Sequence, residues 1–444
     1  MTEVAIIGGG LAGVEAAWAA IGLGASVTLY EMKPERFSPA HRLAGLGELV
    51  CSNSLKSLSF ENGSGLLKEE MRLFGSLVIE AAEATSVPAG QALAVDRERF
   101  SDYITQKLVS AGVNIIRKEI TELPKDRPLI IATGPLTSEG FATTLGAMLG
   151  SGGLFFYDAI APVVYKESID FDIAFMGARY DKGGADYINC PMNKAEYEGF
   201  VGALLGAEKT LGKDFEKIPY FEGCMPVEAI AERGPDTLAF GPLRPVGFTD
   251  PRTGKRPHAI VQLRCENKEE TIYNIVGFQT SLTRPEQKRV FSLIPGLGEV
   301  SFARYGSIHR NSYINSPLLL GNTLELKENS GIFLAGQITG VEGYCESAAM
   351  GIIAGISAFM SSAGLEFVAP PPSTMTGALI RYITSAESCE GKGGFQPMNS
   401  NFGIIEGGGG GKKRRGPVVE KALTEASGWR TKILQLLGVS GSVR

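Results

Sequence analysis

The first thirty residues show a strand–turn–helix–strand pattern of apolar and small residues. Residues 4–7 form a short β-branched run of the kind found in strands that are buried on both faces. A glycine-rich turn follows, and residues 14–24 then carry small residues, several of them alanine, with helical spacing. Residues 27–31 form a second apolar run, which ends in Glu31. The pattern predicts two parallel strands connected by a helix.

Later apolar runs extend this pattern. Residues 128–131 predict a strand that ends in Ala-Thr-Gly. Residues 331–334 predict another strand, which precedes a glycine-rich turn and a helix of small residues near 347–351. Helical spacing also appears at residues 66–74 and 96–109.

Two stretches depart from this alternation. Residues 36–60 are polar, contain proline and glycine, and are predicted to form a loop. From about residue 165, short apolar or alternating runs lie among proline- and glycine-rich turns, with one helical stretch at 195–205. This pattern of short runs and turns predicts an α+β insertion within the α/β fold. Its short runs are residues 171–176, 238–241, 259–263 and 271–276.

Composition limits the class of protein. The 444 residues exceed what one hydrophobic core usually supports, so we expect two or three domains. The longest apolar run, residues 348–360, is short for a membrane helix, and the N-terminus lacks the features of a signal peptide. Six cysteines without a C-x-x-C pair and three histidines argue against a zinc site and fit a reduced, cytoplasmic protein without a metal.

The charge is distributed unevenly. Residues 407–444 carry a net charge of +6, against −11 for the rest of the chain. Residues 406–411 predict a flexible hinge, and helical stretches follow at 418–426 and 429–437. A basic tail on an acidic body indicates an anionic partner, with nucleic acid the first candidate. The basic residues that follow the glycines are candidates for phosphate contacts: Lys412, Lys413, Arg414 and Arg415.

The glycine-rich turn has the spacing G-x-G-x-x-G. Gly8 permits a tight turn, Gly10 lets the backbone approach a pyrophosphate, and Gly13 lets helix and strand pack closely. Glu31, 18 residues after Gly13, can accept a hydrogen bond from a ribose hydroxyl. These features predict a dinucleotide site. The expected cofactor-binding residues in it are Gly8, Gly9, Gly10, Leu11, Ala12, Gly13 and Glu31.

Two later motifs favour FAD over NAD. The Ala-Thr-Gly at Gly134 and the Ala-Gly-Gln at Gly336 and Gln337, with Gly343 after it, resemble the cofactor motifs of FAD enzymes of the glutathione-reductase type. The expected fold is therefore α/β, a Rossmann-like FAD-binding domain of that type with an α+β insertion domain. We expect the FAD-binding domain at residues 1–169 and 301–405, the insertion domain at 170–300, and the hinge and basic tail at 406–444.

Four blocks of the chain resemble one family in particular. They are residues 8–13, Cys-Ser-Asn-Ser-Leu-Lys at 51–56, Tyr-Phe-Glu-Gly-Cys-Met-Pro-Val-Glu at 220–228, and residues 336–344. Together they resemble the bacterial folate- and FAD-dependent tRNA (uracil-5-)-methyltransferases, TrmFO, which are related to GidA (MnmG). The second and third blocks separate the two groups, because the flavin motifs are shared.

The resemblance implies a reaction and its participants. One carbon passes from 5,10-methylenetetrahydrofolate to C5 of the T-loop uridine, position 54 of tRNA, with NAD(P)H as reductant through FAD. The catalytic cysteines it implies are Cys51 and Cys224. Either could attack uracil C6 while the other assists. His309 is a candidate for stacking the folate pterin, although a lone histidine is as often a satisfied structural group. We expect no obligatory protein partner.

Three alternatives remain open from the sequence. A GidA-like wobble-uridine enzyme would need a long helical C-terminal domain and a GTPase partner. A plain NAD(P)H:flavin oxidoreductase is disfavoured because the chain has neither C-x-x-C nor C-x-x-x-x-C. A flavin-stabilised RNA-binding module without catalysis is disfavoured by the two cysteine blocks.

Overall fold

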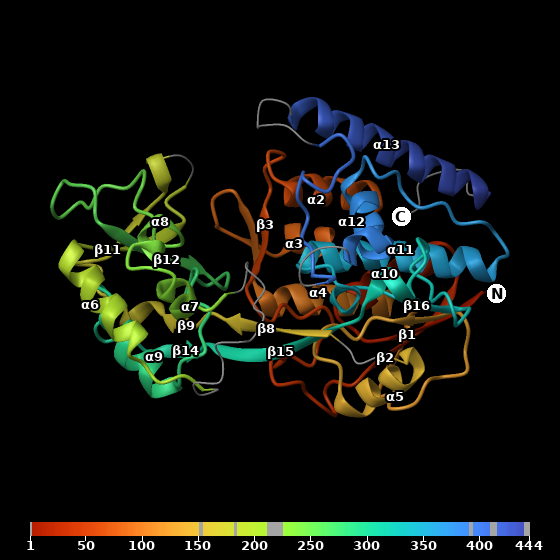
Figure 1. Ribbon diagram of the computed structural model, residues 1–444, viewed down its shortest axis with the longest axis horizontal. Coiled ribbons are helices and arrows are strands. Elements are labelled where there is room, and N and C mark those ends of the chain that lie inside the picture. The colour runs from red at the N-terminus through yellow and green to blue at the C-terminus, as the bar shows by residue number, and fades with distance from the viewer. Residues whose placement is uncertain are drawn as a thin grey trace.

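A five-stranded parallel sheet forms the centre of the larger part of the protein (Figure 1). The computed structural model describes residues 2–150, 154–181, 184–210, 225–389, 394–408 and 415–438. The sheet order is β16–β7–β1–β2–β6, so β16, from the C-terminal half of the chain, is an edge strand that pairs with β7 beside β1. The strands are β1 (Glu3–Ile7), β2 (Ser26–Glu31), β6 (Asn114–Arg117), β7 (Leu129–Ile131) and β16 (Ile332–Leu334).

Two helices from opposite ends of the chain pack closely beside this sheet. Helix α1 (Leu11–Gly22) contacts α11 (Tyr344–Ser362) more extensively than any other pair of elements. A Cβ atom on Gly351 would lie 2.2 Å from the carbonyl oxygen of Ala12, and one on Gly355 would lie 2.5 Å from that of Ala16. Glycine at both positions is therefore what lets the two backbones approach so closely.

Helix α11 is the single helix of the described residues that is long and apolar enough to cross a membrane. It is longer than the apolar run at 348–360 that the sequence indicated. Its most apolar 18-residue window is 83% buried inside the protein. The apolarity of α11 is thus accounted for by its place in the core.

Further helices cover the same domain, and buried carboxylates join them. Glu15 on α1 accepts a hydrogen bond from the backbone N–H of Val78, at the start of α3, at 2.9 Å. Glu70 on α2 accepts one from the N–H of Met375, at the start of α12, at 2.7 Å. Burial raises the pKa of each carboxyl to about 7. The helices are α2 (Gly63–Leu73), α3 (Leu77–Ala84), α4 (Arg97–Ser110), α5 (Glu139–Leu149), α10 (Ser316–Leu319) and α12 (Met375–Thr384).

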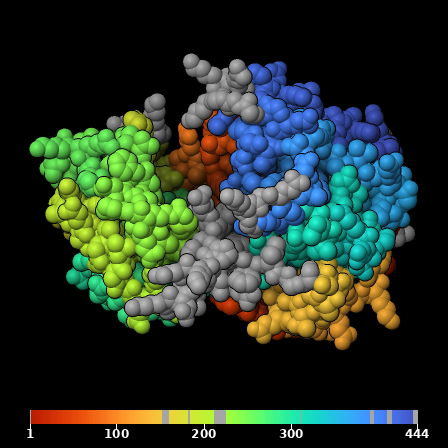
Figure 2. All heavy atoms as spheres, in the orientation of Figure 1, coloured from red at the N-terminus to blue at the C-terminus, as the bar shows by residue number. Residues whose placement is uncertain are grey.

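The smaller part of the protein has its own sheet and its own core. Six strands in the order β10–β11–β12–β13–β9–β14 pair antiparallel, and helices cover them. Figure 2 shows this part, in yellow-green, as a lobe with a notch between it and the rest. The strands are β9 (Val163–Tyr165), β10 (Phe175–Gly177), β11 (Tyr187–Met192), β12 (Ala259–Cys265), β13 (Ile272–Ile275) and β14 (Phe302–Arg304). The helices are α6 (Lys194–Leu205), α7 (Val227–Glu232), α8 (Thr237–Phe240) and α9 (Arg284–Phe291).

Two short sheets complete the architecture. Strands β8 (Leu154–Ile160) and β15 (Ser307–Tyr313) pair antiparallel and form the ribbon by which the chain enters and leaves the smaller lobe (Figure 1). Strands β3 (Ser54–Ser57), β5 (Ala92–Val95) and β4 (Ser86–Val87) form a three-stranded sheet beside the parallel one. Strand β3 lies within residues 36–60, which the sequence predicted to be entirely loop.

The predicted fold class is confirmed: a parallel Rossmann-type domain carries an α+β insertion. The C-terminal region differs from the prediction in one respect. The two expected helical stretches form one continuous helix, α13 (Arg415–Leu436), which lies across α2 (Figure 1). Gly428 lies between the two stretches, and the helix continues through it because its next residue is anchored in the core.

That anchor is Trp429. Its ring lies edge-on to Phe74 at 5.0 Å and to Phe367 at 6.3 Å, and its indole N–H donates to the carbonyl oxygen of Val368 at 2.6 Å. Ala422, Ala426 and Ile433 are buried on the same face of the helix. Helix α13 is therefore part of the core of the larger domain.

Trp429→Ala should lower the free energy of unfolding by about 3–5 kcal/mol, because it removes a buried aromatic side chain and leaves a cavity. The measurement is urea denaturation followed by circular dichroism. Lys432→Ala, at an exposed position of the same helix, is the control and should change little. Equal stability of the two variants would contradict the packing of α13.

Candidate active site: two joined cavities and the Cys51 loop

The glycine-rich turn between β1 and α1 has the geometry of a dinucleotide cradle. Gly8 has φ = 104°, and its N–H donates to the carbonyl oxygen of Tyr30 at 2.8 Å. A Cβ atom on Gly13 would lie 1.8 Å from the carbonyl oxygen of Gly8, so this position tolerates glycine alone. At Gly10 an added Cβ would meet no protein atom within 4 Å. The space above Gly10 is the space that a pyrophosphate needs.

Glu31 is at the end of β2, where the sequence expects an acidic residue. Its side chain accepts hydrogen bonds from the backbone N–H of Gly9 at 2.7 Å and from that of Lys33 at 2.9 Å. Each carboxylate oxygen has a second lone pair, which leaves it able to accept from a ribose hydroxyl.

A cavity of about 1050 Å³, counting its open mouth, begins at this turn. Gly134 (φ = 68°) and Gly336 (φ = 84°) line it, each just after a strand of the parallel sheet. The carboxyl ends of three neighbouring strands thus meet at one site, as expected of ligand sites in parallel sheets. The predicted cofactor residues that line this cavity are Gly8, Gly9, Gly10, Leu11, Ala12, Glu31, Gly134, Gly336 and Gln337.

A second cavity, of about 1210 Å³, adjoins the first. Five residues line both: Val50, Pro135, Leu136, Gln337 and Tyr344. The second cavity is also lined by Cys51 and Gly343. An elongated cofactor that occupies the first cavity would therefore present one end to the cavity that contains the candidate cysteine.

Tyr344, the first residue of α11, holds the Cys51 loop. Its phenol oxygen accepts hydrogen bonds from the backbone N–H of Cys51 at 2.7 Å and from that of Ser52 at 3.0 Å. Burial and the neighbouring Cys51 raise the pKa of Tyr344, so the phenol stays protonated. The loop is thereby fixed to the helix that lines both cavities.

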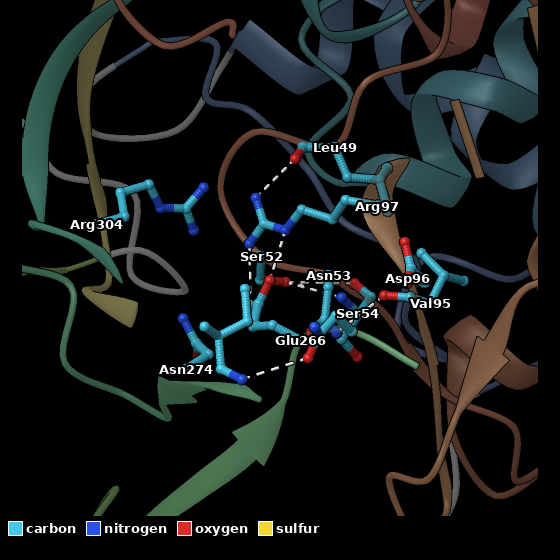
Figure 3. Close-up of polar contacts among 12 residues, drawn as sticks. Leu49, Ser52, Asn53, Ser54, Val95, Asp96, Arg97, Glu266, Asn274 and Arg304 are labelled. Atoms are coloured by element: carbon cyan, nitrogen blue, oxygen red, sulfur yellow. Dashed lines mark hydrogen bonds and ion pairs between the residues drawn. The ribbon is translucent and has the colours of Figure 1, made fainter. Parts of the chain in front are cut away.

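Asn53 fastens the same loop to the smaller lobe (Figure 3). Its amide nitrogen donates to the carbonyl oxygens of Val95 at 3.0 Å and Cys265 at 2.8 Å, and its oxygen accepts from Arg264 Nε at 3.0 Å. The side chain of Asn53 is fully buried. A buried amide with its hydrogen bonds made fixes the local geometry, because any displacement would leave polar atoms unpaired.

Arg97 adds an ion pair across the same junction (Figure 3). Its guanidinium contacts the carboxylate of Glu266 at 2.7 and 3.1 Å and also donates to the carbonyl oxygen of Leu49 at 2.7 Å. Arg304 lies nearby, with Nη1 3.5 Å from the carbonyl oxygen of Val50. Burial, together with repulsion from Arg97, lowers the pKa of Arg304 to about 10.

The remaining predicted site residues are dispersed. Cys224, Lys412, Lys413 and Arg414 lie outside the described residues. His309 lies on β15, and its side chain is not described. Arg415 lies at the start of α13, where its guanidinium contacts the ring of Phe402 at 4.9 Å and the carbonyl oxygen of Glu61.

Two of the cysteines without an expected role, Cys190 and Cys265, are in the core of the smaller lobe. Burial raises the pKa of Cys190 to about 12 and also raises that of Cys265. Neither is suited to form a thiolate. Within the described part of the chain, no three His, Cys, Asp or Glu side chains group as a metal site.

Sequence reasoning missed several residues of the second cavity. Tyr344 belongs to residues 336–344, one of the four blocks that carry the family resemblance, but the resemblance assigned it no role. Lys56 and Glu346 form an ion pair there at 3.4 Å. The pattern gave no sign of this contact, because the partners are 290 residues apart.

The fold and the joined cavities define an α/β flavoprotein. Residues 3–366 match the family model described as GIDA, Glucose inhibited division protein A. The GidA structure from Aquifex aeolicus superposes with a TM-score of 0.71 at 18% identity and covers 99% of this chain and 76% of that chain. At this level of identity the match shows the fold alone.

Sequence relatives assign the chain to one group within this family. The "Methylenetetrahydrofolate--tRNA-(uracil-5-)-methyltransferase TrmFO" of Geobacter sulfurreducens is 56% identical over 431 residues, covering 96% of this chain and 98% of that protein. The protein of the same name from Caldicellulosiruptor bescii is 57% identical over 404 residues, covering 91% and 92%. The chain therefore belongs to the TrmFO group of the GidA family.

Gly10→Val should fold normally but lose FAD. The protein itself leaves room for the side chain, which would instead occupy the space of the pyrophosphate. The measurements are the flavin absorbance of the purified variant and its thermal unfolding. Gly13→Ala is the contrasting variant and should fail to fold, because its Cβ meets the backbone of Gly8. A soluble Gly10→Val protein with full flavin content would contradict the assigned cradle.

Proposed function

We propose that this protein is a methylenetetrahydrofolate–tRNA (uracil-5-)-methyltransferase. It transfers a one-carbon unit from 5,10-methylenetetrahydrofolate to C5 of the T-loop uridine, position 54 of tRNA. The observation that carries the proposal is its identity of 56% to a named TrmFO over 96% of the chain, together with a cysteine in a cavity that adjoins the dinucleotide cradle. FAD, reduced by NAD(P)H, supplies the hydride that turns the transferred carbon into a methyl group.

The residues of the second cavity suit this chemistry. Uracil C5 is a poor nucleophile, and a thiolate that adds to C6 converts it into an enolate-like carbon. Cys51 is half-buried and lines the cavity, and its loop is held on two sides, by Tyr344 and by Asn53. Such a loop keeps the thiol in position while a substrate is bound. We propose Cys51 and Cys224 as the catalytic pair.

The alternatives are less well supported. A GidA-like wobble-uridine enzyme has the same fold, and the match to the Aquifex aeolicus GidA structure, at 18% identity, shows the fold alone. The curated relatives at 53–57% identity carry the TrmFO name instead. A plain NAD(P)H:flavin oxidoreductase would not account for that identity.

Several finer assignments belong to the same proposal. The FAD-binding residues are those of the cradle together with Gly134, Gly336, Gln337 and Gly343, and His309 contacts folate. The FAD-binding domain comprises residues 1–169 and 301–405, with the insertion domain at 170–300; the separate six-stranded sheet supports an insertion here, and its strands β9 and β14 lie just outside these bounds. The tail at 406–444 contacts tRNA phosphates. The enzyme works in the cytoplasm, without a membrane or an obligatory protein partner.

The direct test is product formation. Unmodified tRNA incubated with the protein, methylenetetrahydrofolate and NADPH should acquire one 5-methyluridine, located at position 54 by nuclease digestion and mass spectrometry. Omission of the folate or of NADPH should abolish it. Modification of the wobble uridine instead would favour the GidA-like alternative, and oxidation of NADPH with no modified nucleoside would favour a plain oxidoreductase.

Replacement of the cysteines tests the catalytic pair. Cys51→Ala and Cys224→Ala should each lower the yield of 5-methyluridine by at least about 100-fold, since each removes a thiol on which the chemistry depends. Cys190→Ala and Cys265→Ala are the controls and should retain activity, because those thiols are buried away from the cavity. Near-normal turnover in either of the first two variants, at normal flavin content, would remove that cysteine from the mechanism.

A further inference from the structure

Lys56 has an unusual backbone conformation. Its φ is 65°, in the left-handed region that non-glycine residues seldom adopt. It is the last residue of the Cys-Ser-Asn-Ser-Leu-Lys block, five positions after Cys51. Conformations of this kind cost free energy and persist where the surrounding structure imposes them, often at functional sites.

A buried carboxylate holds the side chain of Lys56. Its Nζ lies 3.4 Å from Glu346 Oε1, and the Glu346 side chain is fully buried while that of Lys56 is 46% exposed. The same oxygen of Glu346 accepts from the backbone N–H and the hydroxyl of Ser400, at 3.0 and 2.6 Å. Burial opposes the charge of Lys56, but Glu346, Cys345 and Glu342 together outweigh burial and raise the pKa of Lys56 above its ordinary value.

Gly343 leaves room for this ion pair. A Cβ atom there would lie 2.1 Å from Glu346 Oε2 and 3.0 Å from Lys56 Nζ. Gly343 has φ = 125° and directly precedes α11, so the pair lies at the N-terminus of that helix. Glycine at this position thus serves the ion pair as well as the expected cofactor contact.

Lys56 retains donor capacity within the second cavity although it is paired with Glu346. Two cationic residues of the described chain line this cavity, Lys56 and Arg264. Arg264 is buried and donates to Asn53. One carboxylate contact leaves two of the three ammonium hydrogens of Lys56 available. The cavity that Cys51 lines therefore also holds a charged donor suited to an anionic oxygen of a bound substrate.

We propose that Lys56 is a catalytic residue that donates a hydrogen bond to O4 of the target uracil, and that Glu346 is the positioning residue that holds it there. This inference rests on the proposed function. When a cysteine thiolate adds to C6, the sulfur–carbon bond forms and the C5=C6 π bond breaks. The electron pair becomes delocalised over C5, C4 and O4, so the negative charge of the thiolate passes to the base. An ammonium group fixed at O4 stabilises that charge more than it stabilises the neutral uracil.

Lys56→Asn tests the role of the ammonium charge without disturbing the backbone conformation. Lys56→Asn removes the ammonium but tolerates the left-handed backbone. It should lower kcat by about 100- to 1000-fold, the usual effect of losing one oxyanion donor, with little change in KM for tRNA and normal flavin content. Lys56→Arg should recover part of the rate. Lys166→Asn is the matched control and should be unaffected, because Lys166 is 41% exposed and paired with Glu270 outside the cavity.

A tRNA that carries 5-fluorouridine traps the covalent adduct, because fluorine cannot leave C5 as a cation in the way that the proton does. The rate at which it forms a covalent adduct with the enzyme, followed by denaturing gel electrophoresis, should fall in Lys56→Asn by the same factor as kcat. A raised KM with unchanged kcat and adduct rate would overturn the proposal, since Lys56 would then bind a ground-state anion such as a phosphate or a folate carboxylate. An unchanged kcat and KM would also overturn it.

Glu346→Gln tests the positioning role. Without the carboxylate the pKa of Lys56 should fall, so the alkaline decline of kcat should begin at lower pH than in the unmodified enzyme. Glu346→Asp should restore the original profile in part. An unaltered pH profile would remove Glu346 from the proposal. Failure of the unmodified enzyme to form 5-methyluridine in the same assay would count against the proposed function instead.

Discussion

The buried amide of Asn53 is the contact on which the arrangement of the active site depends. It joins the Cys51 loop and β5, both in the larger part of the protein, to β12 in the sheet of the smaller lobe. Because its polar atoms have their partners inside the protein, neither lobe can shift at this point without breaking charged or buried hydrogen bonds. The ion pair of Arg97 with Glu266 reinforces the same junction. The smaller lobe thus forms part of the wall that positions the candidate nucleophile.

The site combines two kinds of rigidity. Close backbone contacts at Gly8 and Gly13 shape the dinucleotide cradle, and neither of these two positions accommodates a side chain. Hydrogen-bonded side chains shape the second cavity, where Tyr344 and Asn53 each hold the Cys51 loop from a different direction. The first arrangement suits a cofactor that stays bound, and the second suits a pocket that must orient reacting groups.

The sequence predicted those features whose causes are local. The glycine turn and Glu31 belong to one strand–helix–strand unit, so their spacing alone carries the information. The contacts of Asn53 with Cys265 and of Lys56 with Glu346 join residues more than 200 positions apart, and no periodicity reports on them. The sequence predicted two helices where the protein has the single helix α13. Glycine within a helix weakens it by about 1 kcal/mol, but burial of the adjoining Trp429 offsets that loss.

The ribbon of β8 and β15 has a consequence for how the chain reaches this structure. Strand β16 pairs with β7 although about 200 residues separate them in sequence. Once β15 has paired with β8, the free chain between the two partners shortens to roughly 40 residues. Since the entropic cost of closing a loop grows with the logarithm of its length, that shortening lowers the closure cost by about 1.4 kcal/mol. Early folding of the insertion would therefore speed completion of the parallel sheet, and a destabilised ribbon would delay the folding of a domain to which it contributes no strand.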